Sequence, residues 1–345
     1  MTRLERAACP LCRGTARRPI CLKFDLPIVA CRGCGLVLAD PRRPWSELMT
    51  RYDRTDFVAE CLASLKISGE ALDLNHIRNH FHIPLALLGD APRRGARLLD
   101  VGCGPGGFIL SAAGLRWAGE GVEVSAALAA FSQDVAGVSV WEGPFESSEI
   151  PAETYDAVTL LDVIEHVPEP DKVLDKAAQV LRPGGKLIVS TPDFRSLSRR
   201  ILGWNWAVLS PAEHLFYFTA GTLTRILKEA GFEVRGAVNV LAFNPEATHA
   251  PGTRRHLRWR RVHTCLEKTR LVRKIQNHEM RRLLRMTGKS DAVRPTPAWK
   301  RCLSGLYDGL RTVVRGDMLY ALAFKNNKND CESIKPKNRK EGKSC

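Results

Sequence analysis

"LLDVGCGPGG", residues 98–107, is an apolar run that ends in an acid and passes directly into glycines. The apolar residues at 97–101 predict a buried parallel strand, and "GCGPGGFILSAA" predicts a glycine turn that enters a helix near Gly106. A strand, a glycine turn and a helix in this order form the first unit of a Rossmann-like α/β sheet. Ligands of such sheets bind at the carboxyl ends of the strands, so the stretch predicts the fold class and the place of a ligand.

The acid in this stretch indicates which ligand the turn accepts. Gly102, Gly104 and Gly107 match the dinucleotide pattern G-x-G-x-x-G. An ionised Asp100 beside the turn would repel a pyrophosphate, but it would attract a phosphate-free ligand with a cationic amino-acid end, such as S-adenosylmethionine. Glu123, at the end of the next predicted strand in "GEGVEVS", can accept the hydroxyl protons of a ribose. The residues expected to bind this cofactor are therefore Asp100, Gly102, Gly104, Gly106 and Glu123.

Two later stretches carry a family resemblance. "YDAVTLLDVIEHVPEP" (155–170) and "LRPGGKLIVSTPDF" (181–194) follow the glycine turn in order, and together the segments resemble class I S-adenosylmethionine-dependent methyltransferases. The resemblance implies a seven-stranded Rossmann-like sheet with an antiparallel last strand, which residues 232–243 and 317–325 would complete. It also implies that Asp162 contacts the cofactor or the acceptor. Because Pro144 stands where the family often has an acid, we expect backbone groups around Phe145 to recognise adenine.

The N-terminal cysteines predict a metal site. "CPLC" and "CRGCG" place Cys9, Cys12, Cys31 and Cys34 in two C-x2-C pairs that are eighteen residues apart. Two tight turns of this kind can aim free backbone N–H groups at the thiolates and supply a tetrahedral four-sulfur site for Zn²⁺. Four thiolates leave no coordination position for water or substrate, so we expect a structural zinc ribbon over residues 1–45.

The ribbon and the core together resemble a subgroup of bacterial methyltransferases that act on sugars, natural products and quinone-type substrates. In this subgroup a Glu-His pair follows the fifth strand and lies near the acceptor, which implies Glu213 and His214 in "SPAEHLFYFTAGTLTRIL". We expect His214 to act as the general base and Glu213 to fix its ring or raise its pKa. The alternative is that His214 caps a helix beginning near Thr219.

Aromatic residues on either side of the core add two weaker expectations. In the same subgroup a Tyr-Asp element covers the cofactor pocket, and Tyr52 and Asp53 in "RYDRTDFV" resemble it. Trp204 and Trp206 in "GWNWAV" are candidates either for the wall of an acceptor pocket or for the core.

The positive charge is confined to the last quarter of the chain. The whole chain carries +15, but residues 251–345 have 25 Lys and Arg against 8 Asp and Glu, a net +17, and residues 1–250 are nearly neutral. Residues 245–316 are expected to form a basic helical insertion before the last strand, with helices near 256–286 and 299–314. Three readings stay open for it: a lid with solvated arginines, a contact with an anionic membrane, and a nucleic-acid contact.

These observations combine into one functional expectation. The predicted order is the ribbon (1–45), linker and cap helices (46–95), a methyltransferase core (96–244), the insertion (245–316), the last core strand (317–325) and a disordered tail (326–345). We expect O-methylation of a small-molecule, sugar or lipid-linked acceptor. The alternatives are an RNA methyltransferase and a non-catalytic module that only binds the cofactor. Because no signal peptide or membrane span is evident, we expect a cytoplasmic protein, with peripheral membrane contact as an option.

Overall fold

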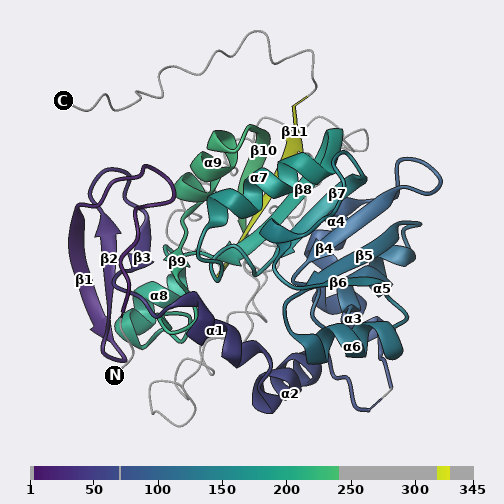
Figure 1. Ribbon diagram of the computed structural model, residues 1–345, viewed down its shortest axis with the longest axis horizontal. Helices are drawn as coiled ribbons and strands as arrows, with labels where there is room; N and C mark the ends of the chain where they lie inside the picture. The colour runs from purple at the N-terminus through teal and green to yellow at the C-terminus, as the bar shows by residue number, and fades with distance from the viewer. Residues whose placement is uncertain (1–3, 70, 241–316, 327–345) are drawn as a thin grey trace, which may run out of the picture.

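The computed structural model describes residues 4–69, 71–240 and 317–326, which form a large central sheet with helices on both faces and a smaller sheet at the N-terminus (Figure 1). The strands are β1 (Arg17–Lys23), β2 (Leu26–Cys31), β3 (Val37–Ala39), β4 (Arg97–Val101), β5 (Ala118–Glu123), β6 (Val140–Glu142), β7 (Tyr155–Leu161), β8 (Leu181–Pro192), β9 (Phe216–Tyr217), β10 (Phe232–Val240) and β11 (Met318–Lys325). The helices are α1 (Trp45–Tyr52), α2 (Thr55–Ser64), α3 (Leu74–His80), α4 (His82–Leu88), α5 (Gly107–Ala113), α6 (Ala126–Asp134), α7 (Pro170–Val180), α8 (Leu197–Leu202) and α9 (Ala220–Glu229), with 3₁₀ turns η1 (Phe145–Ser147) and η2 (Gly203–Asn205).

The central sheet has seven strands in the order β10-β11-β8-β7-β4-β5-β6. Strands β6, β5, β4, β7 and β8 are parallel, and β11 lies antiparallel between β8 and β10. The chain leaves β4 towards β5 on one side and later returns to β7 on the other side, so the strand order reverses at β4. In open α/β sheets this reversal places the ligand crevice at the carboxyl ends of the strands. The predicted fold class, with an antiparallel last strand, is confirmed.

Burial on both faces explains the continuous apolar runs of the central strands. Leu99 of β4 and Val158 of β7 belong to the hydrophobic cluster that also contains residues of α7 and α9. Their chain neighbours Leu98 and Ala157 belong to a second cluster, with residues of α4 and α5. Because successive side chains of a strand point to opposite faces, every position of such a strand is buried when both faces carry helices.

The N-terminal sheet is completed by a strand from the core. Its order is β1-β2-β3-β9, and β9 lies between β8 and α9 in the sequence. Val37 pairs with Tyr217 and Leu38 with Phe216, both antiparallel. Figure 1 shows β9 beside β3 at the left of the molecule. The ribbon is therefore continuous with the chain segment that follows the fifth core strand, a connection that the sequence did not predict.

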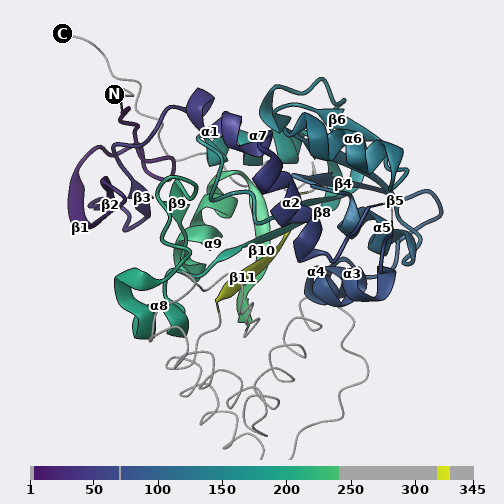
Figure 2. The same cartoon turned by 90° about the horizontal axis from the view of Figure 1, so that it is seen from below.

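Four helices connect the ribbon to β4, within the segment predicted to hold linker and cap helices. Helices α1 and α2 run from the ribbon towards the right-hand half of the central sheet, as Figures 1 and 2 both show. Helix α3 packs on α5, where Ile77 would contact any side chain at Gly107, 3.1 Å from the position of its Cβ. These helices therefore cover the side of the fold on which the glycine turn begins.

The predicted basic insertion (245–316) and most of the predicted tail lie outside the described residues. Strand β11 resumes directly after the insertion and spans almost all of the predicted last strand. None of the helices among the described residues is long and apolar enough to cross a lipid bilayer.

Candidate functional site

The glycine turn begins directly after β4 and has left-handed backbone angles at alternate residues. The φ angles of Gly102, Gly104 and Gly106 are 70°, 52° and 79°. Residues with a Cβ are strained in this region, whereas glycine adopts it readily. A Cβ at Gly102 would also lie 2.6 Å from Cγ2 of Val163, so this position has no room for a side chain. The turn thus brings bare backbone to the carboxyl ends of β4 and β7.

Glu123 ends β5 and is 5% exposed. Its carboxylate accepts hydrogen bonds from the backbone N–H of Gly104 at 2.8 Å and of Ser125 at 2.9 Å. Burial raises the pKa of Glu123, and these two backbone donors oppose the rise. A carboxylate offers about four lone-pair sites, so beside these backbone donors the group can still accept a hydroxyl proton from a ligand.

Asp100 lies beneath the glycine turn and is 3% exposed. The hydroxyl of Thr159 on β7 donates to its Oδ1 at 2.5 Å. Burial raises the pKa of Asp100 to about 7, with a smaller contribution from the charge of Glu123, while the Thr159 hydrogen bond acts in the opposite direction. A positive ligand group nearby would favour the ionised form. The charge of this residue therefore depends on what binds above it.

Asp162 follows β7 with a left-handed backbone, at a φ of 57°. A non-glycine residue in this region costs on the order of 1–3 kcal/mol, which the surrounding contacts must offset. Ser190 at the end of β8 provides them, because its hydroxyl donates to Asp162 Oδ1 at 2.7 Å and accepts from the Asp162 N–H at 3.0 Å. The neighbouring strand thus holds the carboxylate in place.

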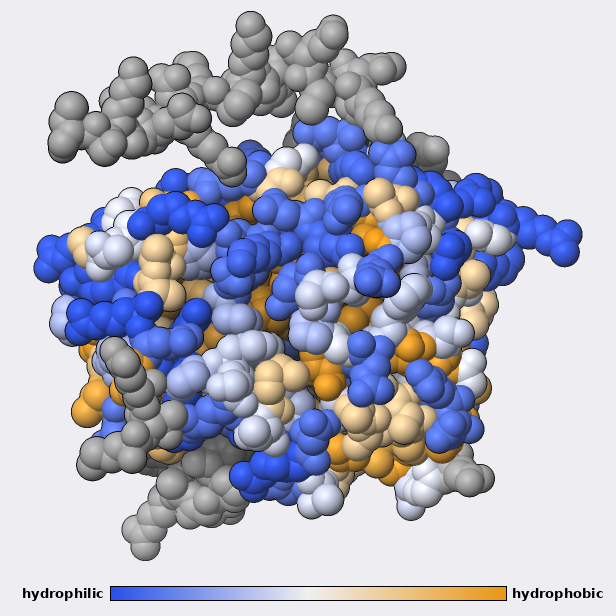
Figure 3. All heavy atoms as spheres, viewed as in Figure 1, coloured by the Kyte–Doolittle hydropathy of each residue, from blue (hydrophilic) through white to orange (hydrophobic). Residues whose placement is uncertain are grey.

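A pocket lies at the carboxyl ends of β4, β5 and β7. Five residues predicted from the sequence line it: Gly102, Gly104, Glu123, Phe145 and Asp162. Asp100 and Gly106, which were also predicted to bind the cofactor, are not among the described residues that line it. On the face of the molecule shown in Figure 3, hydrophobic side chains are visible in recesses near the centre, between hydrophilic ones.

One end of the pocket contains a residue that the sequence analysis missed. Gly143, Pro144 and Phe145 line this end, and Glu146 lies beside them. Related methyltransferases often have an acid at the position of Pro144. In this chain an acid, Glu146, lies two positions later, in the η1 turn. In the sequence, Glu146 is visible as the acid of "GPFES", two positions after Pro144.

Aromatic side chains from the first two helices also contribute to the wall of the pocket. Trp45, Tyr52 and Phe57 line the pocket, and the Tyr52 ring centroid lies 6.3 Å from that of Trp45 and 5.2 Å from that of Phe57. Asp53 accepts a hydrogen bond from the backbone N–H of Ala126 at 3.1 Å, which joins the end of α1 to the start of α6. Tyr52 thus lines this pocket, whereas Asp53 does not line it and instead ties α1 to α6.

Two histidine rings lie in edge contact beside the pocket. His166 lines the pocket, whereas His214 does not and lies in edge contact with His166, at a centroid distance of 4.6 Å. Nδ1 of His166 is 3.1 Å from the carbonyl oxygen of Glu213, and Nδ1 of His214 is 2.6 Å from that of Val208. A carbonyl only accepts, so each Nδ1 carries the proton and each Nε2 is left with a free lone pair.

Burial also determines the protonation of these rings. It lowers the pKa of His214, and it lowers that of His166 to about 3, with His214 contributing. Both rings are therefore neutral near neutral pH. The alternative role for His214, as a helix cap, is wrong, because Thr219 caps α9 in a capping box with Thr222.

Glu213 does not orient the neighbouring imidazole. Its carboxylate accepts from Arg51 of α1 at 2.6 Å, and the His214 ring bonds to the Val208 carbonyl instead. The charge of Glu213 favours protonation of His214, but burial outweighs that effect. The expectation that Glu213 fixes the ring is therefore wrong, because its side chain turns towards α1.

Glu165 is the most unusual polar group at the site. It is 1% exposed, and among the described residues neither of its carboxylate oxygens has a close hydrogen-bond partner. Burial raises its pKa well above the usual value, and the nearby charge of Asp162 adds to the rise. A carboxylate O of Glu165 and a ring nitrogen of each of His166 and His214 lie within 4.8 Å of one another. Two imidazoles and a carboxylate are a donor set that divalent metal ions accept.

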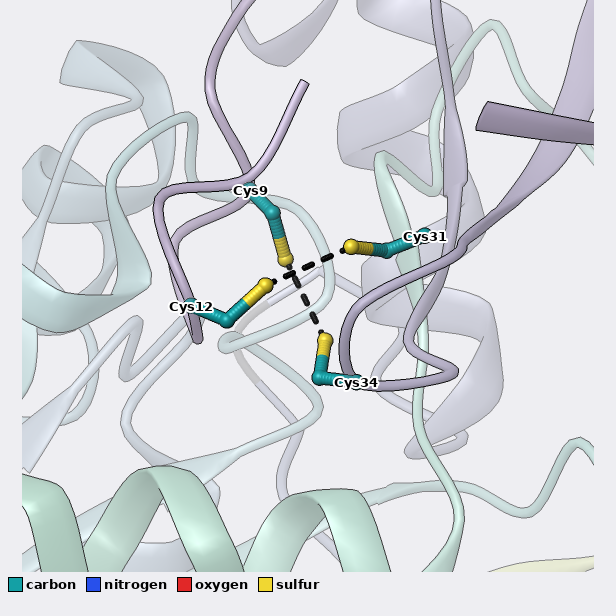
Figure 4. A group of neighbouring side chains, drawn as sticks. All are labelled: Cys9, Cys12, Cys31 and Cys34. Atoms are coloured by element: carbon teal, nitrogen blue, oxygen red, sulfur yellow. Dashed lines mark hydrogen bonds between the residues drawn. The ribbon is translucent and has the colours of Figure 1, made fainter. Parts of the chain in front are cut away.

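The four N-terminal cysteines converge in a second cluster. Figure 4 shows their sulfur atoms pointing towards one another, with 3.5 Å between Cys9 and Cys34 and 3.4 Å between Cys12 and Cys31. The sulfurs of a tetrahedral zinc site lie about 3.8 Å apart, because each Zn–S bond is about 2.3 Å. Backbone N–H groups of Leu11 and Cys12 bond to Cys9, as the predicted turn requires. The donor set and its geometry therefore fit Zn²⁺.

The two tryptophans proposed for an acceptor wall lie elsewhere. Trp206 is fully buried in a cluster with Phe194, Leu209 and Tyr217, and Trp204 is 49% exposed on η2. Neither lines the pocket. Trp206 thus takes the core role that the sequence had left open.

Comparisons with known proteins agree with this geometry. A family model described as a methyltransferase domain matches residues 75–236. The ubiquinone biosynthesis O-methyltransferase of Pseudomonas savastanoi pv. phaseolicola is 31% identical over 173 residues, which cover 45% of this chain and 72% of that protein. The enzyme of the same name from Idiomarina loihiensis is 32% identical over 174 residues, or 44% of this chain and 67% of that protein.

Solved structures support the same fold. Phosphoethanolamine N-methyltransferase 2 of Haemonchus contortus, in complex with S-adenosyl-L-methionine, superposes with a TM-score of 0.50. The identity is 18%, and the match covers 84% of this chain and 63% of that one. At this identity the likeness concerns the fold alone.

Proposed function

The chain belongs to the S-adenosylmethionine-dependent methyltransferases, and from that premise we propose that it methylates an oxygen atom of a small-molecule, sugar or lipid-linked acceptor. The similarity to O-methyltransferases supports oxygen as the acceptor atom. The observation that carries the proposal is a pair of neutral histidines beside the acidic, glycine-lined pocket, because transfer to a hydroxyl requires removal of its proton.

The proposed binding roles follow from the pocket. Glu123 accepts the ribose hydroxyls, and backbone groups around Phe145 hold the adenine, with Glu146 beside them. Asp100 stabilises the positive charge of the amino-acid end from beneath the glycine turn. Asp162 faces the same end from the neighbouring strand. The bound cofactor would supply a methyl group attached to a positively charged sulfur. The neutral thioether that remains is a good leaving group.

The proposed proton path uses the histidine pair. Nε2 of His166 takes the acceptor proton, and the ring of His214 packs edge-on against that of His166 and holds it in place. S-adenosylmethionine, held by Glu123 and the glycine turn, would supply the methyl group to the acceptor oxygen and would itself keep the electrons of the carbon–sulfur bond. The aromatic wall of Trp45, Tyr52 and Phe57 excludes water, and alignment in this dry pocket supplies much of the rate enhancement.

The cysteine cluster has a separate role. We propose that Cys9, Cys12, Cys31 and Cys34 hold one structural Zn²⁺ as thiolates. Four protein ligands leave the ion no open position, so the ion stabilises the ribbon and takes no part in methyl transfer.

Calorimetric titration with S-adenosylmethionine tests the cofactor site. The full chain should bind it in the micromolar range and should not bind NAD, and Asp100→Ala and Glu123→Ala should each weaken binding at least tenfold. Glu142→Gln, an exposed acid one strand away, is the matched control and should bind normally. Folded protein that does not bind S-adenosylmethionine would contradict the proposal.

Turnover then tests the acceptor. Catechols, polyketides, sugars and lipid-linked phenols are incubated with methyl-labelled cofactor, and the products are identified by mass spectrometry. Methylated oxygen on any of them is the expected result. Labelling of RNA alone would replace the small-molecule assignment with the RNA alternative.

A further inference from the structure

A second concave site lies where the ribbon meets the core. This groove has a volume of about 490 Å³, and its lining includes Arg18, Arg32, Arg195, Phe194 and Thr219. None of its lining residues also lines the cofactor pocket. The methyltransferase activity does not account for this groove.

The strand register explains why the groove is hollow. Arg18 of β1 pairs with Ala30 of β2, and Ala30 pairs with Val37 of β3. Residues that pair across strands place their side chains on the same face of the sheet. The row therefore has an arginine at its outer edge and two small apolar side chains as its floor. Phe194 faces this floor from the core.

The rim of the groove carries basic side chains. Arg18, Arg32 and Arg195 are all exposed, and no Asp or Glu is among the described residues that line the groove. Within the described part of the chain, Arg18 and Arg195 form no ion pair, and Arg32 only donates to the Arg17 carbonyl at 3.2 Å. By contrast, the neighbouring Arg17 pairs with Asp40 at 2.5 Å. Three guanidinium groups around one hollow repel one another unless an anion lies between them.

Backbone geometry adds to the positive potential. Thr219 lines the groove and is the N-cap of α9, a ten-residue helix whose positive dipole end therefore faces the groove. Asp193, the acid closest to Arg195 in sequence, accepts from the Arg195 N–H and from Asn239, and it does not line the groove. The described polar residues of the groove are therefore basic or neutral, apart from Cys31 of the cysteine cluster, which also lines it.

We propose that this groove binds a diphosphate ester, with the diphosphate between the arginines and the apolar part of the ester on the floor. Guanidinium groups match phosphate oxygens through paired hydrogen bonds. Three positive charges balance a diphosphate ester, whose terminal phosphate is mostly doubly ionised near neutral pH. The half-buried Ile20 and the edges of the buried Ala30, Val37 and Phe194 supply an apolar floor that inorganic phosphate alone would not use. The site does not depend on methyl transfer.

Two sources share this chemistry, a nucleoside diphosphate and a prenyl diphosphate, and titration distinguishes them. The full chain is titrated calorimetrically with inorganic pyrophosphate, UDP and farnesyl diphosphate at low ionic strength. At least one ester should bind more tightly than pyrophosphate because of the floor. Tighter binding of UDP indicates a nucleotide source, and tighter binding of farnesyl diphosphate indicates a lipid source.

Variants locate the binding. Arg18→Gln and Arg195→Gln should each weaken the preferred ester at least tenfold, whereas Arg94→Gln, an exposed arginine before β4, should have no effect. Each variant should bind S-adenosylmethionine as the native chain does, which shows that it is folded and keeps this test separate from that of the proposed function. Ester binding that survives in both groove variants belongs elsewhere in this basic chain, and that result overturns the proposal. The proposal is also overturned if neither ester binds more tightly than inorganic pyrophosphate.

Discussion

Asp100 is the single residue whose charge depends most directly on the ligand. It is buried, its pKa is raised to about 7, and its one side-chain partner is the hydroxyl of Thr159. A cationic amino-acid group above it would favour the carboxylate and lower that pKa. Protonated Asp100 must therefore lose its proton when the cofactor binds, and this couples affinity to pH.

We predict that affinity for S-adenosylmethionine rises as the pH increases from about 6 to 8 and then levels off. Affinity rises with pH because, near pH 7, Asp100 is protonated in part of the free protein but ionised in the complex. Calorimetric titration across this range measures the effect. Asp100→Asn, which cannot ionise, should bind weakly with little pH dependence, and an unchanged slope in that variant would assign the titration to another group.

The two histidines make a second prediction at this scale. Removal of a general base typically costs about 10²- to 10⁴-fold in rate, so His166→Ala should lower kcat by at least about 100-fold. His214→Ala should lower kcat less, because His214 lies behind His166. Affinity for the cofactor should stay within about twofold in both variants.

A pH–rate profile distinguishes this chemistry from a packing defect. If the histidines act on the proton, the activity of His166→Ala should recover partly at high pH, where a phenolic acceptor ionises by itself. If His214→Ala retains full turnover, His214 is not part of the mechanism.

At the scale of elements, the ribbon and the acceptor side of the site share a sheet. One residue, Leu215, separates His214 from β9, and both residues of β9 pair with β3. The backbone N–H of Ala39 also donates to the Leu215 carbonyl at 3.0 Å. The turn that carries Cys31 and Cys34 joins β2 to β3, so the position of β3 depends on the cysteine cluster.

We therefore predict that loss of zinc lowers kcat at least tenfold and leaves cofactor affinity within about twofold. Cys34→Ser or treatment with a strong chelator removes the ion, and metal analysis with steady-state kinetics measures the result. Zinc binding contributes about 10–16 kcal/mol to the folding of small zinc modules, so the melting temperature should fall as well. Cys21→Ser, on the same sheet but outside the cluster, is the matched control. Full activity of folded, zinc-free protein would separate the ribbon from catalysis.

At the scale of the whole molecule, charge and fold are unevenly distributed. Residues 1–250 are nearly neutral and supply most of the described fold, whereas residues 251–345 carry a net +17. Each basic residue near an anionic membrane contributes about 1 kcal/mol, so even a few of them would hold the enzyme at a surface.

We predict that the full chain co-sediments with vesicles that contain anionic lipid and is released by salt. Vesicles of neutral lipid are the control, because the expected attraction is electrostatic and is screened at high ionic strength. Equal binding to neutral and anionic vesicles would exclude this attraction, and binding to RNA alone would favour the nucleic-acid reading.

The fold class and the glycine turn were predictable from the sequence because their signals are local. Double-sided burial produces continuous apolar runs, and the left-handed turn after β4 requires Gly102, Gly104 and Gly106 within a few positions of Asp100. The cluster of four cysteines was equally predictable, because each of its two C-x2-C pairs lies in one tight turn.

The tertiary structure alone decided what distant segments build together. It turned Glu213 towards α1, placed His166 in the pocket with His214 behind it, and left both oxygens of Glu165 buried without close partners among the described residues. It also added β9 to the ribbon sheet and gathered three arginines from two segments around one groove. The physical reason is that burial and electrostatic environment depend on contacts across the fold, whereas a sequence pattern records only the environment that a residue shares with its chain neighbours.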